Sequence, residues 1–198
     1  MADASDLQDE ALWHGGRYEL ALELGDRDES RLQAALQAVW GAAEVEGCLG
    51  PTDGRPPGYH DVPCTVEHVE RHGWLAGVAR LPRGRSVVVA ARVIRQRSGT
   101  DWLVFFVPVV ALELAEPRSA AFGFRGADSL LWRRPLDRWL ARLGQSVHRV
   151  APCRLGLIGP DVAALTTARK LAGAPPAERW AGFLLPQGAE LVYLAADR

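Results

Sequence analysis

The feature that most constrains the fold of this 198-residue chain is a set of three apolar segments between residues 74 and 112. They span residues 74–81, 86–95 and 101–112, and they are rich in the Val, Ile, Trp and Phe side chains that favour strands. Residues 82–84 and 96–100 connect them, and both connections are short and contain glycine. Parallel strands need a long crossover, so such connections indicate antiparallel pairing. The segment predicts a central β-meander.

Periodic patterns on either side of the meander predict the other elements. Residues 17–24 alternate apolar and charged side chains, which indicates a strand, and apolar positions recur at helical spacing over residues 27–41. Further strands are expected at 44–49, 154–158, 180–185 and 190–195, further helices at 135–150 and 161–171, and loops at 50–58 and 116–127. The predicted fold is therefore α+β, a mostly antiparallel sheet with two or three amphipathic helices packed on it. Uninterrupted apolar stretches in the meander indicate that both sheet faces are covered, and we expect helices to cover them.

The sequence of one region is consistent with two secondary structures, and the length of the chain indicates the number of domains. Residues 63–73 fit either a helix that ends at Gly73 or a strand, and we favour the strand because it would extend the meander. The chain has 48% apolar residues and a length that supports one core. We expect a single domain over residues 1–198, with residues 1–14 as a polar leader for which disorder is an open alternative.

Cysteine usage and hydropathy indicate the compartment. The three cysteines are far apart in sequence and form no CxxC pair, which favours a reducing environment over a disulfide framework. No stretch approaches the roughly 20 apolar residues of a membrane span, and the acidic opening residues do not resemble a secretory signal. Of the 23 basic residues only Lys170 is a lysine, a bias that a GC-rich bacterial genome also produces. We expect a cytoplasmic bacterial protein without a membrane span.

Charge is divided unevenly along the chain, although the net charge is only −1. Residues 1–70 contain 15 acidic side chains and 4 arginines, a net charge of −11, whereas residues 71–198 contain 9 acidic and 19 basic side chains, a net charge of +10. Residues 71–100 contain no acidic side chain and seven arginines: Arg71, Arg80, Arg83, Arg85, Arg92, Arg95 and Arg97. Such asymmetry indicates an anionic partner, and the open alternative is that the two halves neutralise each other.

Four potential metal ligands recur at a spacing of four residues: His60, Cys64, His68 and His72. On a helix, adjacent members would lie about 6 Å apart, close enough to share a zinc ion. On a strand, Cys64 and His68 would stand about 13 Å apart, which is too far. The spacing matches no standard zinc module. A metal-dependent enzyme that uses these residues is therefore a second alternative only, and surface histidines beside a buried cysteine are the simpler interpretation.

The frames that usually carry catalysis or bind nucleotides do not occur in the sequence. It contains no GxSxG, no Walker lysine motif, and no GxGxxG between a strand and a helix. Acidic pairs such as Glu67 and Glu70 lie in an acidic segment that supplies them by chance. We therefore predict no catalytic residue and no cofactor, and the chain is not expected to be an enzyme.

The hypothesis that uses both halves of the charge pattern is recognition of another protein. We expect a non-catalytic interaction or binding module of the immunity-like or chaperone-like kind, with segregated acidic and basic surfaces. The predicted partner-binding residues lie at exposed turns and in the glycine-containing loop GFRG: Arg83, Arg85, Arg97, Phe124 and Arg125. The first alternative is a nucleic-acid-binding protein that contacts phosphates through the arginine-rich meander. The pI of about 6.5 argues against that alternative.

Overall fold

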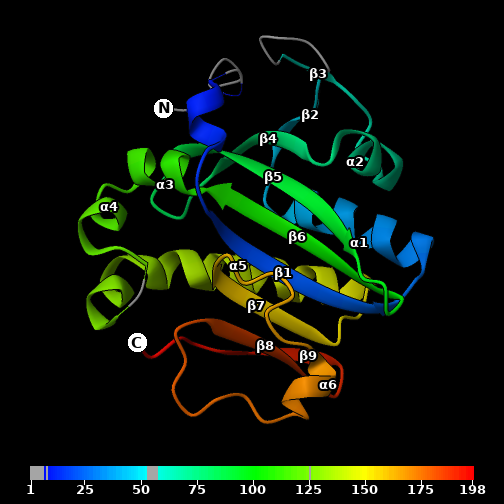
Figure 1. Cartoon of the computed structure of the whole chain (residues 1–198), viewed down its shortest axis with the longest axis vertical. Coiled ribbons are helices and arrows are strands. Elements are labelled where there is room, and N and C mark those ends of the chain that lie inside the picture. Colours follow the sequence, from blue (N-terminus) through cyan, green and yellow to red (C-terminus); the bar gives the residue numbers. More distant parts are fainter. Residues whose placement is uncertain (1–6, 8, 53–57, 125) are drawn as a thin grey trace.

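A nine-stranded antiparallel sheet forms the centre of the computed structural model, which describes residues 7, 9–52, 58–124 and 126–198 (Figure 1). In this described part the strands are β1 (Arg17–Asp26), β2 (Glu46–Pro51), β3 (Tyr59–Asp61), β4 (Leu75–Arg80), β5 (Ser86–Arg95), β6 (Thr100–Pro108), β7 (Leu155–Pro160), β8 (Gly182–Gln187) and β9 (Glu190–Leu194). Their order across the sheet is β3-β2-β4-β5-β6-β1-β7-β8-β9. The α+β fold class is confirmed, and so is the meander β4–β5–β6.

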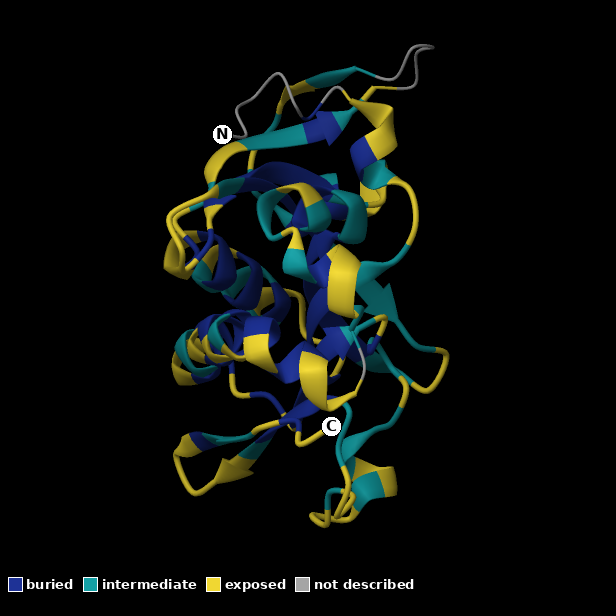
Figure 2. Cartoon of the chain, turned by 90° about the vertical axis from the view of Figure 1, so that its left-hand side faces the viewer, coloured by how far each residue is buried: buried dark blue, intermediate teal, exposed yellow. Residues whose placement is uncertain are grey.

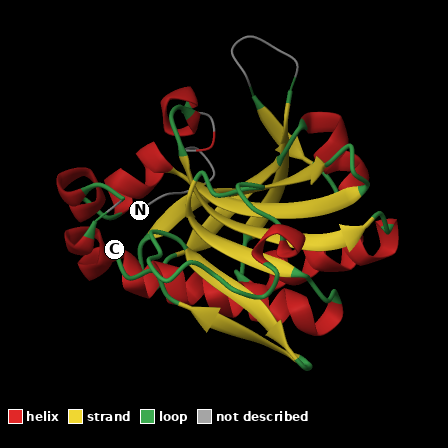
Figure 3. Ribbon diagram, turned by 60° about the horizontal axis from the view of Figure 1, so that its bottom comes forward, coloured by secondary structure: helices red, strands yellow, loops and turns green. Residues whose placement is uncertain are grey.

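Helices lie between the strands in sequence and mostly on one face of the sheet (Figures 1 and 3). They are the 3₁₀ helix η2 (Glu10–Trp13), α1 (Glu29–Ala42), α2 (Val66–His72), α3 (Val109–Ala115), α4 (Arg118–Phe122), the 3₁₀ helix η3 (Ala127–Ser129), α5 (Leu130–Val150) and α6 (Ala168–Leu171). Within the described residues, none of the helices is long and apolar enough to cross a membrane.

Helices α1 and α5 cover one face of the sheet and contact each other. Trp139 of α5 meets Phe105 of β6 edge to face, with ring centroids 5.9 Å apart. A glycine permits the close approach of α5, because a Cβ atom at Gly144 would lie 2.6 Å from Leu184 Cδ1 of β8. The buried residues in Figure 2 accordingly concentrate between this helical layer and the sheet.

A large part of the opposite face is covered by the chain after β7, which is mostly irregular and contains only the short helix α6, and not by the longer helices that we expected. On strand β1, Glu19 and Glu23 alternate with the side chains that face α5. The backbone N–H groups of Ala163 and Ala168 donate to these two carboxylates at 2.9 and 2.7 Å. These hydrogen bonds hold the chain after β7 against the sheet, so that strand β1 is buried on both faces of the sheet.

Four expectations about local structure were wrong. Residues 66–72 form helix α2 and not a strand, because Thr65 caps the helix N-terminus and Gly73 ends it with φ 84°. The third meander strand ends at Pro108 and continues as helix α3. Part of the expected loop at 116–127 is helix α4. Most of the expected helix at 161–171 is irregular, and only α6 remains.

Two further boundaries differ from expectation. Helix α5 begins at Leu130, five residues before Pro135, which therefore lies inside the helix. Of the polar leader at residues 1–14, the described part contains η2, with Leu7 and Leu12 buried. Trp13 stacks on Trp74 with ring centroids 6.1 Å apart, so this part of the leader packs on the sheet.

Candidate functional site

The predicted partner-binding arginines lie at two opposite ends of strand β5. Arg83 and Arg85 are exposed in and beside the β4–β5 turn, and Arg97 is exposed in the β5–β6 turn. A ten-residue strand is about 33 Å long, so the three side chains do not share one surface. Arg83 pairs with Glu116 at 3.3 Å, and Arg85 donates to the Leu114 carbonyl at 3.5 Å.

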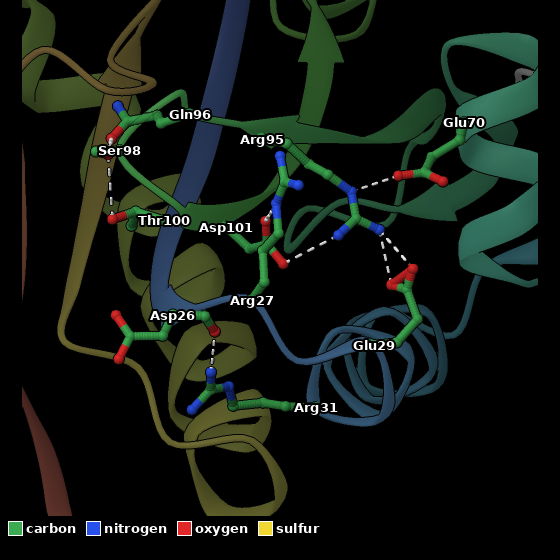
Figure 4. Close-up of polar contacts among 10 residues, drawn as sticks. All are labelled: Asp26, Arg27, Glu29, Arg31, Glu70, Arg95, Gln96, Ser98, Thr100 and Asp101. Carbon is green, nitrogen blue, oxygen red and sulfur yellow. Dashed lines mark hydrogen bonds and ion pairs between the residues drawn. The ribbon is translucent and has the colours of Figure 1, made fainter.

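Arg95 is bound by three carboxylates on different elements (Figure 4). Its guanidinium donates to both oxygens of Glu29 at 2.6 and 2.7 Å, to Glu70, and to Asp101 at 3.3 Å. The Asp101 side chain is 1% exposed. Hydrogen bonding to Glu29, with Glu70 and Asp101 nearby, raises the pKa of Arg95 above its ordinary value. The cluster joins α1, α2 and the β5–β6 hairpin. The charge of this meander arginine is therefore neutralised within the protein.

Arg92 is also engaged inside the protein. It donates to Glu19 at 2.9 Å, and its guanidinium lies 6.0 Å from the Phe106 ring centroid. Burial raises the pKa of Glu19 above its ordinary value, although the Ala163 N–H and Arg92 counteract this. With Arg71, which pairs with Glu67 at 2.6 Å, three of the seven arginines at residues 71–100 bind carboxylates of the first seventy residues, counted over the described chain. Internal neutralisation therefore accounts for part of the charge asymmetry.

The GFRG loop contributes a packing residue. Phe124 is half-buried, with ring centroids 5.8 Å from Tyr18 and 5.3 Å from Trp132. Its carbonyl accepts a hydrogen bond from the buried Arg133. Arg125 lies outside the described residues.

The histidines gather on one surface, but the cysteine points elsewhere. The His72 ring on α2 lies 5.4 Å from that of His60 on β3 and 6.1 Å from that of His68. The Cys64 thiol instead donates a hydrogen bond to Cys48, which lowers the pKa of Cys48 and raises that of Cys64. Among the described residues, no three His, Cys, Asp or Glu side chains converge as a metal ion requires.

In the described chain, four arginines form a row of exposed positive charge along α5. Its members, Arg134, Arg138, Arg142 and Arg149, are all exposed. At 100° per residue they lie within about 80° of one another around the helix, and they extend over about 22 Å. In the described part of the chain none of them pairs with a carboxylate, and the Arg149 guanidinium donates a hydrogen bond to Ser146 Oγ at 2.9 Å. We call these four residues the α5 arginine row.

The acidic residue nearest to the row in sequence is turned away from it. Asp137, on the buried side of α5, accepts a hydrogen bond from Tyr18 and lies 3.5 Å from Arg133 Nε. Arg133 is itself fully buried and also donates to the Trp180 carbonyl. Burial raises the pKa of Asp137 to about 6, while the Tyr18 hydrogen bond and Arg133 oppose that change. This network anchors the N-terminal half of α5, so the row is presented by a fixed helix.

Exposed apolar side chains stand at both ends of the row. Leu131 is 69% exposed and Val150 is 59% exposed. Leu131 lies on the same helical stripe as the arginines, and Val150 follows Arg149. Such side chains bury apolar area when a partner docks, whereas the arginines fix its charge.

Our interpretation of the sequence missed the row, although its signal is local. The buried stripe of α5, which contains Trp139, Leu143 and Val147, was recognised from its periodicity. The spacings of four, four and seven between the arginines place them together on the opposite face.

Comparison of the chain with protein-family models, with curated proteins and with solved structures finds no match.

Proposed function

We propose that this protein is a non-catalytic cytoplasmic interaction protein that docks an acidic protein partner on the α5 arginine row. The observation that carries the proposal is that four exposed guanidinium groups share one helix face without a carboxylate from the described chain. In a chain whose net charge is −1, such a concentration of one sign is a local feature. It fits an immunity-like or chaperone-like protein that covers a surface of its partner.

Electrostatics gives the row two effects on association. Unpaired charges on a rigid face attract an oppositely charged surface and raise the association rate, and they disfavour basic competitors. Each arginine can also form a two-pronged hydrogen bond with a carboxylate. Contact of the apolar side chain of Leu131, on the same face, with the partner adds buried area at one end.

The distribution of the other charges favours a protein over a nucleic acid. Four residues beyond the end of α5, Arg154 pairs with Asp26, whose side chain is 84% exposed, so the charge beyond this helix is mixed. The nucleic-acid alternative depended on the arginine-rich meander, and two of its arginines, Arg92 and Arg95, are held by internal carboxylates. A folded acidic protein is able to contact the row alone.

Charge reversal tests the proposal. The protein with Arg138→Glu and Arg142→Glu is compared with the unmutated protein by quantitative affinity capture from nuclease-treated cytoplasm, followed by reconstitution with the purified partner. The matched control is Arg169→Glu with Lys170→Glu, which makes the same charge change on exposed residues of α6. We expect an acidic protein to bind the unmutated and control proteins, to be lost from the row variant, and to dissociate as salt rises.

Three outcomes would contradict the proposal. The first is equal capture by the row variant and the control, and the second is capture that disappears on nuclease treatment. The third is loss of the partner from an Arg83→Glu/Arg85→Glu variant but not from the row variant, which would place docking at the β4–β5 turn. Thermal unfolding of each variant confirms that it is folded.

A further inference from the structure

Strand β9 is at the end of the strand order and pairs with β8 on one side. The hydrogen-bonding pattern with β8 determines which of its main-chain N–H and C=O groups point to the other, unpaired side. Leu191 is opposite Pro186 of β8, and proline has no N–H to donate. Leu191 and Pro186 are therefore a non-hydrogen-bonded pair. Because hydrogen-bonded and non-hydrogen-bonded pairs alternate along an antiparallel ladder, Tyr193 and Leu184, two positions further, are also a non-hydrogen-bonded pair. The main-chain N–H and C=O groups of Leu191 and Tyr193 consequently point away from the sheet.

A side chain of α5 confirms this direction. The Gln145 amide donates to the Leu191 carbonyl at 3.0 Å, which is possible only if that carbonyl is on the outer edge. Among the described residues no strand pairs with this edge, and the β8–β9 hairpin lies at the lower end of the sheet (Figures 1 and 3). A strand edge that no other strand covers is a template for another extended chain.

The α5 arginine row follows the same edge. Gln145 lies on the helical stripe of the row, and it contacts β9 at Leu191. The charges of Arg134 and Arg138 act on Tyr193, whose pKa is raised mainly by burial and by Asp137. Tyr193 therefore faces α5, and the row and the open edge of β9 form two sides of one surface.

We infer that an extended acidic segment of the partner adds to β9 as an antiparallel tenth strand, with alternate carboxylates facing the α5 arginine row. This inference rests on the proposed function and specifies its partner. Side chains on one face of a strand repeat every 6.8 Å or so, and arginines four residues apart on a helix repeat about every 6 Å. The spacing of carboxylates at every second position is therefore similar to that of Arg134, Arg138 and Arg142. Main-chain bonds give affinity and the arginines give selectivity.

The geometry specifies which amides of the segment bind. Residues directly opposite in an antiparallel pair point to the same face of the sheet. The segment's residues opposite Leu191 and Tyr193 therefore carry the carboxylates toward α5. The N–H groups of these same residues donate to the carbonyl oxygens of Leu191 and Tyr193, and the first of these two oxygens also accepts from Gln145 through its second lone pair. The N–H groups of the intervening residues point to solvent.

Backbone N-methylation tests this directly. The probe is a fluorescent nine-residue peptide in which Glu alternates with Val, and two further peptides are N-methylated either at every Glu or at every Val. We expect the parent and the Val-methylated peptide to bind alike, and the Glu-methylated peptide to bind at least about tenfold more weakly, because two hydrogen bonds are lost. Amide exchange at Tyr193 should slow in the complex.

The outcomes separate this inference from the proposed function. Equal binding of all three peptides that is lost in the Arg138→Glu/Arg142→Glu protein overturns strand addition but leaves a docking row. Loss confined to the Val-methylated peptide, or no binding at about 1 mM peptide, also overturns it. The control protein with Arg169→Glu and Lys170→Glu should bind the parent peptide as the unmutated protein does.

Discussion

Replacing Asp137 by Asn should change how the stability of the protein depends on pH. The carboxyl group is on the buried side of α5, and its pKa is raised to about 6 from an ordinary value of 3.8. Burial is the main cause, because it penalises the charged form more than Tyr18 and Arg133 stabilise it. Asn has nearly the same shape and can accept the Tyr18 hydrogen bond, but it never ionises.

The sign follows from proton linkage. A carboxyl whose pKa is higher in the folded state than in the unfolded state holds its proton more tightly when folded, so raising the pH destabilises the fold. The contribution is fully present below about pH 4 and is lost as the pH rises to about 6. The difference in pKa corresponds to about 3 kcal/mol, since each unit is worth about 1.4 kcal/mol.

Urea unfolding followed by circular dichroism, at pH values from 4 to 8, measures the effect. Other groups titrate alike in both proteins, so the difference between the two free energies of unfolding isolates Asp137. We expect the Asp137→Asn protein to gain stability relative to the unmutated protein by up to about 3 kcal/mol between pH 4 and pH 7, and the difference then to remain constant.

A second variant shifts the same transition. Removing the hydroxyl in Tyr18→Phe takes away a hydrogen bond that lowers the pKa of Asp137, so the pH-dependent loss of stability should move to higher pH. Parallel stability curves for the unmutated and Asp137→Asn proteins from pH 4 to pH 8 would refute the reasoning, because they would mean that Asp137 has an ordinary pKa.

Two further predictions concern stability, and denaturant unfolding at pH 7 checks both. Arg95→Ala should lower the free energy of unfolding by about 2–3 kcal/mol, because among the described residues it leaves the buried Asp101 with only the distant Arg27 at 3.9 Å. Arg71→Ala, which removes an exposed pair, should lower it by no more than about 0.5 kcal/mol. Similar losses in the two variants would contradict the role of the cluster in Figure 4. Gly77→Ala should destabilise the protein by about 1–3 kcal/mol, because its Cβ would lie 2.9 Å from a backbone carbonyl oxygen. Gly41→Ala, with open space around it, should stabilise α1 by about 0.5–1 kcal/mol. A Gly77→Ala protein of unchanged stability would contradict the close packing at this position.

Local patterns predicted those parts of the fold whose causes are close in sequence. The β4–β5–β6 meander, the first strand and the helices around residues 27–41 and 135–150 follow from short turns and apolar periodicity. The arginine row was equally accessible, because its spacing is a property of one helix. Local patterns failed at residues 63–73, where helical and extended pairings were both consistent with the side chains.

The sequence by itself determined the central meander, the first strand and the two longest helices, and it placed most basic residues after residue 70. Only the tertiary structure decided which charges remain free. Strand β1 pairs between β6 and β7, which brings Glu19 beside Arg92, and α1 and α2 bring Glu29 and Glu70 to Arg95. These partners are 25 to 73 residues apart, and no local pattern specifies pairing over such separations. The physical reason is that a helix or strand forms from its neighbours in sequence, whereas an ion pair depends on how distant elements pack.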